Sequence, residues 1–134
     1  MVSKVFPATD EALNDALSFT EEQLDLFECP MKIVMQITVC VEEMFVNVAH
    51  YAYGKDTGNV EMVLDSDGSS VSITLIDEGM PFDPLAKADP DVTLSAEERN
   101  IGGLGIYMVK KSMSEVRYGR VDGKNVFTMK KNFF

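Results

Sequence analysis

The sequence predicts an α+β protein with a two-layer sandwich, in which a mixed, mainly antiparallel sheet is covered on one face by three helices. Two pairs of alternating strand-like runs are joined at Asp67-Gly68 and Asp122-Gly123, which are typical hairpin-turn dipeptides. Two helical patterns precede the first hairpin, and a third lies between the hairpins. Because hairpins give antiparallel pairs, the helices are expected to cover one face of the sheet.

Length and composition favour one globular domain spanning residues 1–134. Hydrophobic residues make up 46% and charged residues 25% of the chain, an ordinary globular balance. Twelve Lys and Arg against 22 Asp and Glu give a net charge of −10. Since binding to nucleic-acid phosphates needs a basic patch, we expect no direct nucleic-acid partner.

The sequence also predicts a cytoplasmic protein that does not enter a membrane. The first residues contain no apolar signal region, and no apolar run approaches membrane-spanning length. Cys29 and Cys40 form neither a CxxC motif nor a ligand cluster, so we expect two reduced thiols in or near the core.

The first half of the chain is predicted to hold one strand and two helices. A short β-like run opens the chain, and Thr9 or Asp10 can cap the helical pattern that follows. The second helical pattern begins near Pro30, a residue tolerated in a first helical turn. It extends to Gly54, a residue type that often ends helices.

The second half is predicted to hold two hairpins and one helix. Residues 59–79 form the first hairpin, residues 104–115 the helix and residues 116–134 the second hairpin. Residues 81–101 form a polar, proline-containing loop of a length typical of functional lids or disordered segments. The predicted order is therefore β-α-α-β-β-loop-α-β-β.

The second helix carries the first candidate site. Glu43 and Asn47 are four residues apart, so they share a helix face, at the edge of its apolar arc, whereas Glu42 points elsewhere. A carboxylate there can act as a general base, and an amide oxygen can bind a hard cation. Solvated polar pairs at this spacing are common, and taken alone this pair favours that simpler interpretation.

The sequence "IDEGMPFDP" follows the second strand of the first hairpin. Asp77 comes after an apolar run, so its carboxylate is expected at a strand end, where it can accept a hydrogen bond from an exocyclic amine. Gly79 leaves room for a flat ring. A tight turn would explain Gly79 and Pro81 equally well, but it leaves Asp77 unexplained.

The sequence "NIGGLGIYMVKK" places three glycines directly before the third helix. Such a loop can cradle phosphates with its backbone N–H groups, or it can serve close packing only. Two metal-site alternatives are disfavoured. A calcium loop starting at Asp65 is disfavoured because its twelfth position is Ile76 instead of the required Glu. A histidine-ligated metal site is disfavoured because His50 is the only histidine.

Taken together and in this order, these motifs resemble those of the GHKL, or Bergerat-fold, ATPases. The motifs are E-x-x-x-N on a helix, D-x-G-x-P-F-D-P at a strand end, a lid-length loop, and G-G-L-G-I at the start of a helix. Within this family the chain is similar to the small bacterial anti-sigma-factor serine kinases, and the resemblance covers nearly the whole chain.

The resemblance implies a role for each motif. Glu43 would be the catalytic base, Asn47 would hold Mg²⁺, Asp77 would bind the adenine amino group and Arg99 would approach the γ-phosphate. The implied nucleotide-binding residues are Asn47, Asp77, Gly79, Phe82, Arg99, Gly102, Gly103, Leu104 and Gly105.

Two positions depart from the family pattern. The family commonly places an adenine-pocket threonine near the penultimate strand, where this chain has Lys124 and Asn125, with Thr128 further along. We therefore assign that role to no residue. Tyr51 stands where the family commonly has a histidine.

The resemblance implies an ATP- and Mg²⁺-dependent anti-sigma factor that regulates bacterial transcription. It would phosphorylate a serine of an anti-anti-sigma (STAS-like) partner, sequester a sigma factor and form a homodimer. A nucleotide-gated binding protein without kinase activity is the alternative. A sensor histidine kinase is disfavoured because the chain lacks a dimerisation hairpin with a phosphoacceptor histidine.

Overall fold

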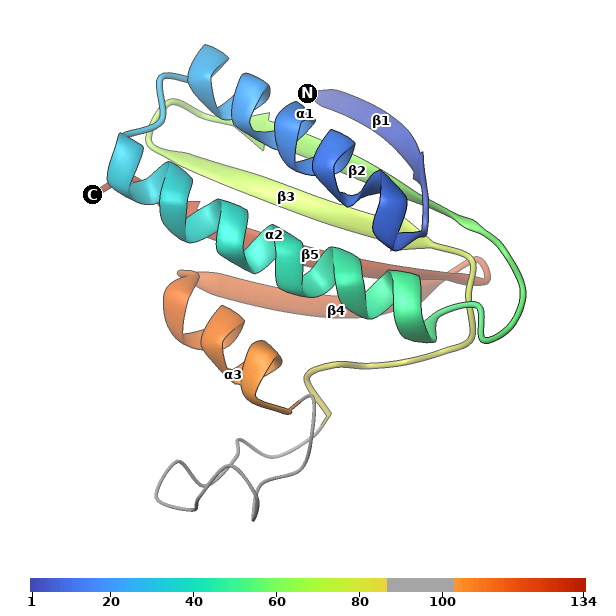
Figure 1. Cartoon of the computed structure of the whole chain (residues 1–134). Helices are drawn as coiled ribbons and strands as arrows, with labels where there is room; N and C mark the ends of the chain where they lie inside the picture. The colour runs from blue at the N-terminus through green and yellow to red at the C-terminus, as the bar shows by residue number, and fades with distance from the viewer. Residues whose placement is uncertain (87–102) are drawn as a thin grey trace.

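The computed structural model describes residues 1–86 and 103–134, and it confirms the predicted order of elements (Figure 1). The elements are β1 (Val2–Pro7), a 3₁₀ turn η1 (Asp10–Ala12), α1 (Leu13–Leu26), α2 (Met31–Tyr51), β2 (Asn59–Ser66), β3 (Ser70–Asp77), α3 (Gly103–Ser112), β4 (Glu115–Val121) and β5 (Lys124–Asn132). The fold class is α+β, as expected, and the three helices lie on one side of the sheet (Figure 1).

The five strands form one sheet in the order β1-β2-β3-β5-β4. All four pairings between described strands are antiparallel, so the expected mixed sheet is corrected to an antiparallel one. The reason lies in the pairing of β3 with β5, which sets the two hairpins side by side in opposite directions. That pairing places Asp77 opposite Asn125 across the sheet.

The turn of the first hairpin forms at the predicted dipeptide. Gly68 has a φ of 91°, a conformation that favours glycine. The Asp67 carboxylate accepts hydrogen bonds from the backbone N–H groups of Ser69 and Ser70. These bonds, with those from the two serine hydroxyls, lower the pKa of Asp67 to about 2.

The core lies between α2 and the sheet. Five side chains of α2 are buried there, namely Ile37, Cys40, Val41, Met44 and Phe45. They belong to the same core cluster as inward side chains of three strands: Met62, Leu64, Ile73, Leu75, Phe127 and Met129. The burial of one face of α2 fixes the rotation of this helix, which determines where its polar residues point.

By length and hydropathy, α2 is a helix that could cross a membrane, contrary to the expectation that no apolar run reaches that length. In this structure 33% of its most apolar 18-residue window is buried. A core helix of a sheet-based domain gives the same compositional signal, and α2 packs against the sheet as such a helix does.

Candidate functional site

A pocket opens between α2, the end of β3 and the β4–β5 hairpin. It brings together three of the residues singled out in the sequence, Asn47, Asp77 and Phe82. The other lining residues are mostly apolar: Met44, Val48, Tyr51, Ala52, Pro84, Tyr118, Asn125 and Phe127. An apolar lining with a few convergent polar groups is typical of a small-molecule site. The cavity measures about 40 Å³, so a purine ring would enter only after side chains at its mouth move apart.

Asp77 is the buried acid of this pocket. It lies at the end of β3, as predicted, and only 6% of its surface is exposed. Its Oδ1 accepts hydrogen bonds of 2.9 Å from the Gly79 backbone N–H and from Asn125 Nδ2. Among the described residues none donates to Oδ2. The carboxylate is therefore held in one orientation and keeps one oxygen for a ligand.

Asn125 is a site residue that the sequence reasoning left unassigned. Its Nδ2 donates to Asp77 and also to the Met80 carbonyl oxygen, at 2.9 Å each. Its Oδ1 accepts from the Tyr118 hydroxyl at 2.5 Å and from the Phe82 backbone N–H at 3.4 Å. Asn125 thus joins the acid, the chain after β3 and the neighbouring strand.

A signal in the sequence could have identified Asn125. The side chains of β5 alternate, and Phe127 and Met129 point into the core with Asn125 two residues before them. A polar residue in the inward phase of an apolar strand needs a partner, because burying an amide without hydrogen bonds is costly.

Gly79 has a packing reason that the sequence did not reveal. A Cβ at this position would lie 2.3 Å from the Ala52 carbonyl oxygen at the C-terminal end of α2. The next residue, Met80, donates its backbone N–H to that same oxygen at 2.8 Å. The glycine therefore lets the chain after β3 lie directly against the C-terminal end of α2.

Tyr53 anchors the chain that surrounds the acid. Its hydroxyl donates to the Asn59 carbonyl oxygen at 2.6 Å and accepts from the Glu78 backbone N–H at 2.9 Å. The pKa of this phenol is raised above its ordinary value, and burial is the largest cause. Tyr53 therefore stays protonated near neutral pH and joins the start of β2 to the end of β3.

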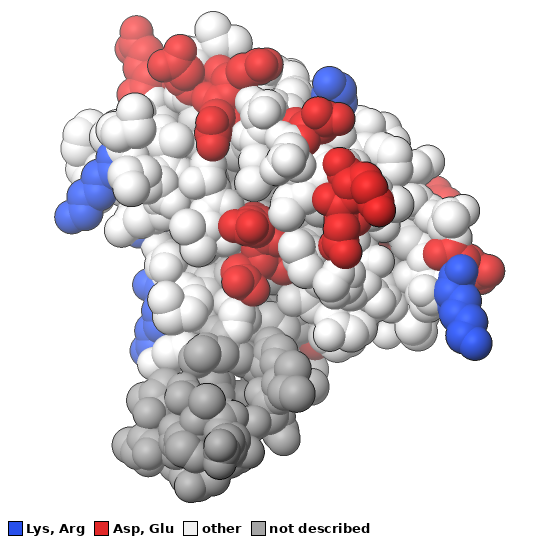
Figure 2. All heavy atoms as spheres, in the orientation of Figure 1, with Lys and Arg blue, Asp and Glu red and all other residues white. Residues whose placement is uncertain are grey.

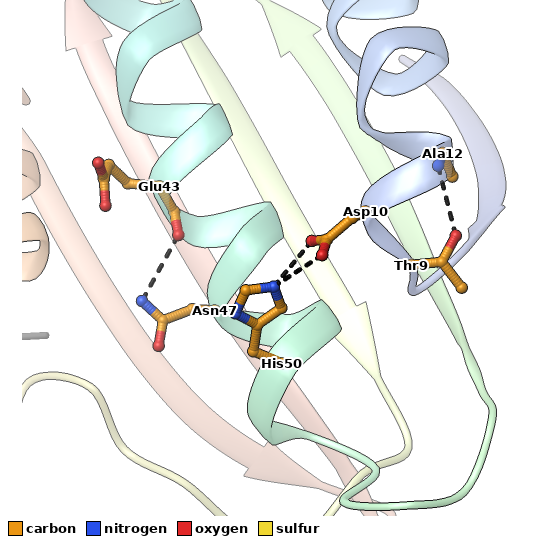
Figure 3. Close-up of polar contacts among 6 residues, drawn as sticks. All are labelled: Thr9, Asp10, Ala12, Glu43, Asn47 and His50. Atoms are coloured by element: carbon orange, nitrogen blue, oxygen red, sulfur yellow. Dashed lines mark hydrogen bonds and ion pairs between the residues drawn. The ribbon is translucent and has the colours of Figure 1, made fainter.

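Glu43 and Asn47 lie on the same side of α2, as predicted (Figure 3). The Asn47 Nδ2 group donates to the Glu43 carbonyl oxygen at 3.5 Å, which leaves the amide oxygen without a partner among the described residues. On another side of the helix, His50 Nε2 lies 2.8 Å from Asp10 Oδ1 (Figure 3). Thr9 accepts from the Ala12 backbone N–H at 3.3 Å and is the cap of the first turn.

The carboxylate of Glu43 lies against the first turn of α3. A Cβ on Gly105 would be 2.3 Å from Glu43 Oε2 and 3.1 Å from Glu43 Cδ. The exposed acid of α2 therefore contacts the helix whose first turn contains Gly103 and Gly105. The sequence instead predicts that this helix begins after the first two glycines. The fold thus brings the candidate base and the end of the glycine motif together, although 62 positions separate them in the numbering.

The remaining candidate residues are only partly described. Arg99 and Gly102, with most of the predicted lid loop, lie outside the described residues. Gly103 is the first residue of α3, and the side chain of Leu104 is not described. Within residues 1–86 and 103–134 no group of three or more His, Cys, Asp or Glu could hold a metal ion. The free oxygen of Asn47 fits a hard cation that takes its other ligands from phosphate.

The helical face of the molecule is acidic. Figure 2 shows Asp and Glu side chains gathered over this face, with Lys and Arg at its margins. This distribution agrees with the net charge of −10 and would attract basic surfaces of other proteins.

Fold and sequence together define a domain of the ATPase type. The family model described as "Histidine kinase-like ATPase domain" matches residues 6–131, and the chain belongs to this family.

Two relatives and one solved structure are similar to the chain. The chain is 24% identical over 122 residues to the serine/threonine-protein kinase BtrW of Bordetella bronchiseptica, with 90% of this chain and 86% of BtrW aligned. It is also 24% identical to the serine-protein kinase RsbW of Bacillus cereus, over 72% of this chain and 63% of RsbW. The structure of the SiaB–SiaC complex from Pseudomonas aeruginosa matches 98% of this chain and 88% of the solved chain, with a TM-score of 0.63 and 16% identity. This last likeness concerns the fold alone.

Proposed function

We propose that the chain is an ATP- and Mg²⁺-dependent protein kinase that phosphorylates a serine of an anti-anti-sigma (STAS-like) protein. In the nucleotide-loaded state it would sequester a sigma factor, as a homodimer in the bacterial cytoplasm. Membership of the kinase-like ATPase family supports the use of ATP. The names of BtrW and RsbW support serine as the acceptor. The complex of SiaB with SiaC supports a protein partner.

One observation carries the proposal: Asn47 and Asp77 line the same pocket, and Glu43 lies one helical turn from Asn47. The free Oδ2 of Asp77 would accept a hydrogen bond from the amino group of adenine. The phosphates would then extend along α2 towards Asn47 and the start of α3. Backbone N–H groups at a helix start favour anions.

Phosphoryl transfer requires that ATP and the partner's serine are positioned together and that one group accepts the serine proton. Bound ATP would supply the phosphoryl group, and Mg²⁺ held by Asn47 would neutralise its charge. The Glu43 carboxylate would accept the proton of the partner's serine hydroxyl while the serine oxygen bonds to the γ-phosphorus. The bond from that phosphorus to the bridging oxygen breaks and ADP leaves. Because Glu43 is exposed, a partner's serine can reach it directly.

The second candidate function is a nucleotide-gated binding protein without kinase activity. Tyr51 favours it, because it lines the pocket where the resembling kinases commonly have a histidine. Such a protein would bind its partner only when loaded with ATP and would return the partner unmodified.

A single-turnover assay distinguishes the kinase from the nucleotide-gated binding protein. The protein is mixed with labelled ATP, Mg²⁺ and each candidate partner, and mass spectrometry then detects an added phosphate on the partner. We expect Glu43→Gln to keep ATP affinity and slow transfer by about 10²–10⁴-fold. Glu42→Gln, a neighbouring exposed carboxylate, is the matched control and should transfer at the parent rate.

Asn47→Ala should fail differently, since it removes an oxygen expected to ligate Mg²⁺. Binding of Mg·ATP itself should weaken, whereas Asn14→Ala on the exposed side of α1 should leave it unchanged. Equal loss of ATP affinity in Glu43→Gln and Asn47→Ala would make Glu43 a structural residue. Absence of transfer to every partner would leave the gated binding protein as the function.

A further inference from the structure

The backbone conformation of Gly105 does not explain why a glycine occupies this position. The glycines with positive φ among the described residues are Gly54, Gly68 and Gly123, and Gly105 is not one of them. Gly105 lies inside α3, where a glycine costs stability relative to alanine. A helix-forming residue would therefore be preferred here unless a side chain had no room.

The room is taken by the Glu43 carboxylate. A Cβ at position 105 would meet Glu43 Oε2 at 2.3 Å, Cδ at 3.1 Å and Cγ at 3.8 Å. The nearest three atoms all belong to this one side chain. To restore an ordinary contact of about 3.5 Å, the carboxylate would have to move by about 1 Å.

We propose that Gly105 is a positioning residue for Glu43: the absence of a side chain at 105 lets the carboxylate lie against the first turn of α3. This inference rests on the proposed function, in which Glu43 accepts the serine proton. It gives Gly105 a role that differs from direct phosphate binding, the role implied by the family resemblance. This one contact then fixes the position of the Glu43 carboxylate relative to α3, the helix expected to lie next to the phosphates.

The proposal predicts a specific kinetic defect in Gly105→Ala. Alanine fits the helix, and Glu43 is an exposed, flexible side chain, so the protein should fold and the carboxylate should shift. A displacement of about 1 Å at a reacting group can cost roughly 10²-fold in rate. We expect kcat for phosphate transfer to fall by about 10- to 100-fold. The KM for ATP and the dissociation constant of ATP should stay within about threefold of the parent, because Glu43 is not a nucleotide ligand.

A double-mutant cycle tests whether Gly105 acts through Glu43. When Glu43→Gln has already removed the base, adding Gly105→Ala should cause no further loss of transfer. If Gly105 instead contacts phosphate, the two losses should multiply and ATP binding should weaken. The control is Gly119→Ala in β4, where the nearest atom to an added Cβ is 4.0 Å away and no change is expected.

A second measurement tests the contact without any enzyme activity. In a Glu43→Cys variant the Sγ atom takes the place of Glu43 Cγ, which lies 3.8 Å from the Cβ position of residue 105. A disulfide then needs an adjustment of about 1 Å. The full chain carrying Gly105→Cys and Glu43→Cys should therefore form that disulfide under mild oxidation. Gly105→Cys with Glu42→Cys is the matched control and should not. Peptide mapping separates the new pair from pairs with Cys29 or Cys40.

The two measurements separate failure of this inference from failure of the proposed function. A kcat defect that vanishes in the Glu43→Gln background, together with the selective disulfide, supports the positioning role. Weakened ATP binding, unchanged transfer in Gly105→Ala, or equal cross-linking from positions 42 and 43 overturns it. If the parent transfers no phosphate, the proposed function and the catalytic role of this contact both fail, and the disulfide then tests the contact alone.

Discussion

Replacing Asn125 with alanine should be the most informative change in the pocket. This residue is 5% exposed and makes four hydrogen bonds, two as donor and two as acceptor. The variant removes a donor from the Asp77 carboxylate and an acceptor from the Tyr118 hydroxyl. It also detaches the chain at Met80 and Phe82 from β5.

The expected loss follows from those bonds. Three of them are 2.9 Å or shorter, and the bond to the Phe82 N–H, at 3.4 Å, is weak. A net contribution of about 0.5–1.5 kcal/mol per bond, larger where one partner is charged, gives about 2–4 kcal/mol for the three. Because Asp77 would lose its fixed orientation, ATP affinity should also fall by roughly tenfold, about 1.4 kcal/mol.

Urea unfolding followed by circular dichroism measures the stability change, since the chain contains no tryptophan for fluorescence. Thr128→Val is the matched control on the same strand. It keeps the β-branched shape and removes one hydrogen bond of 3.2 Å, to Thr74, so it should cost about 1 kcal/mol or less. If the free energy of unfolding of Asn125→Ala lies within about 0.5 kcal/mol of the parent value, the reasoning is refuted. Effects of that size are typical of substitutions at exposed positions without such bonds.

Two further predictions concern ligand selectivity and pH. Guanine carries a carbonyl oxygen where adenine has its amino group, so GTP facing the buried Asp77 carboxylate should bind about 1–3 kcal/mol more weakly than ATP. Equal affinities in calorimetry would contradict this role for Asp77. The pKa of Asp67 is lowered from 3.8 to about 2, chiefly by the backbone N–H of Ser69. Its stabilising contribution should thus be complete above about pH 4 and lost as pH falls towards 2. The urea midpoints of the parent and Asp67→Ala should therefore converge over that range, and a constant difference would exclude this linkage.

Local patterns in the sequence determined the elements and their order. The Asp67-Gly68 turn forms where the dipeptide predicts it, because the turn depends on the conformation of a few neighbouring residues. Glu43 and Asn47 share one side of α2 for the same kind of reason, since the helical period and a single buried face set their direction. Asp77 ends its strand where the apolar alternation stops.

Only the tertiary structure decided which of these groups meet. Asn125 reaches Asp77 because β3 pairs with β5 in one register, a choice among strand orders that no local pattern encodes. The same choice made the sheet antiparallel throughout the described strands. Gly79 approaches Ala52, and Gly105 approaches Glu43, through packing between segments distant in the chain. A glycine in the sequence does not tell whether it serves a turn conformation or a close contact, and the neighbour at Gly79 or Gly105 follows from how the helices pack.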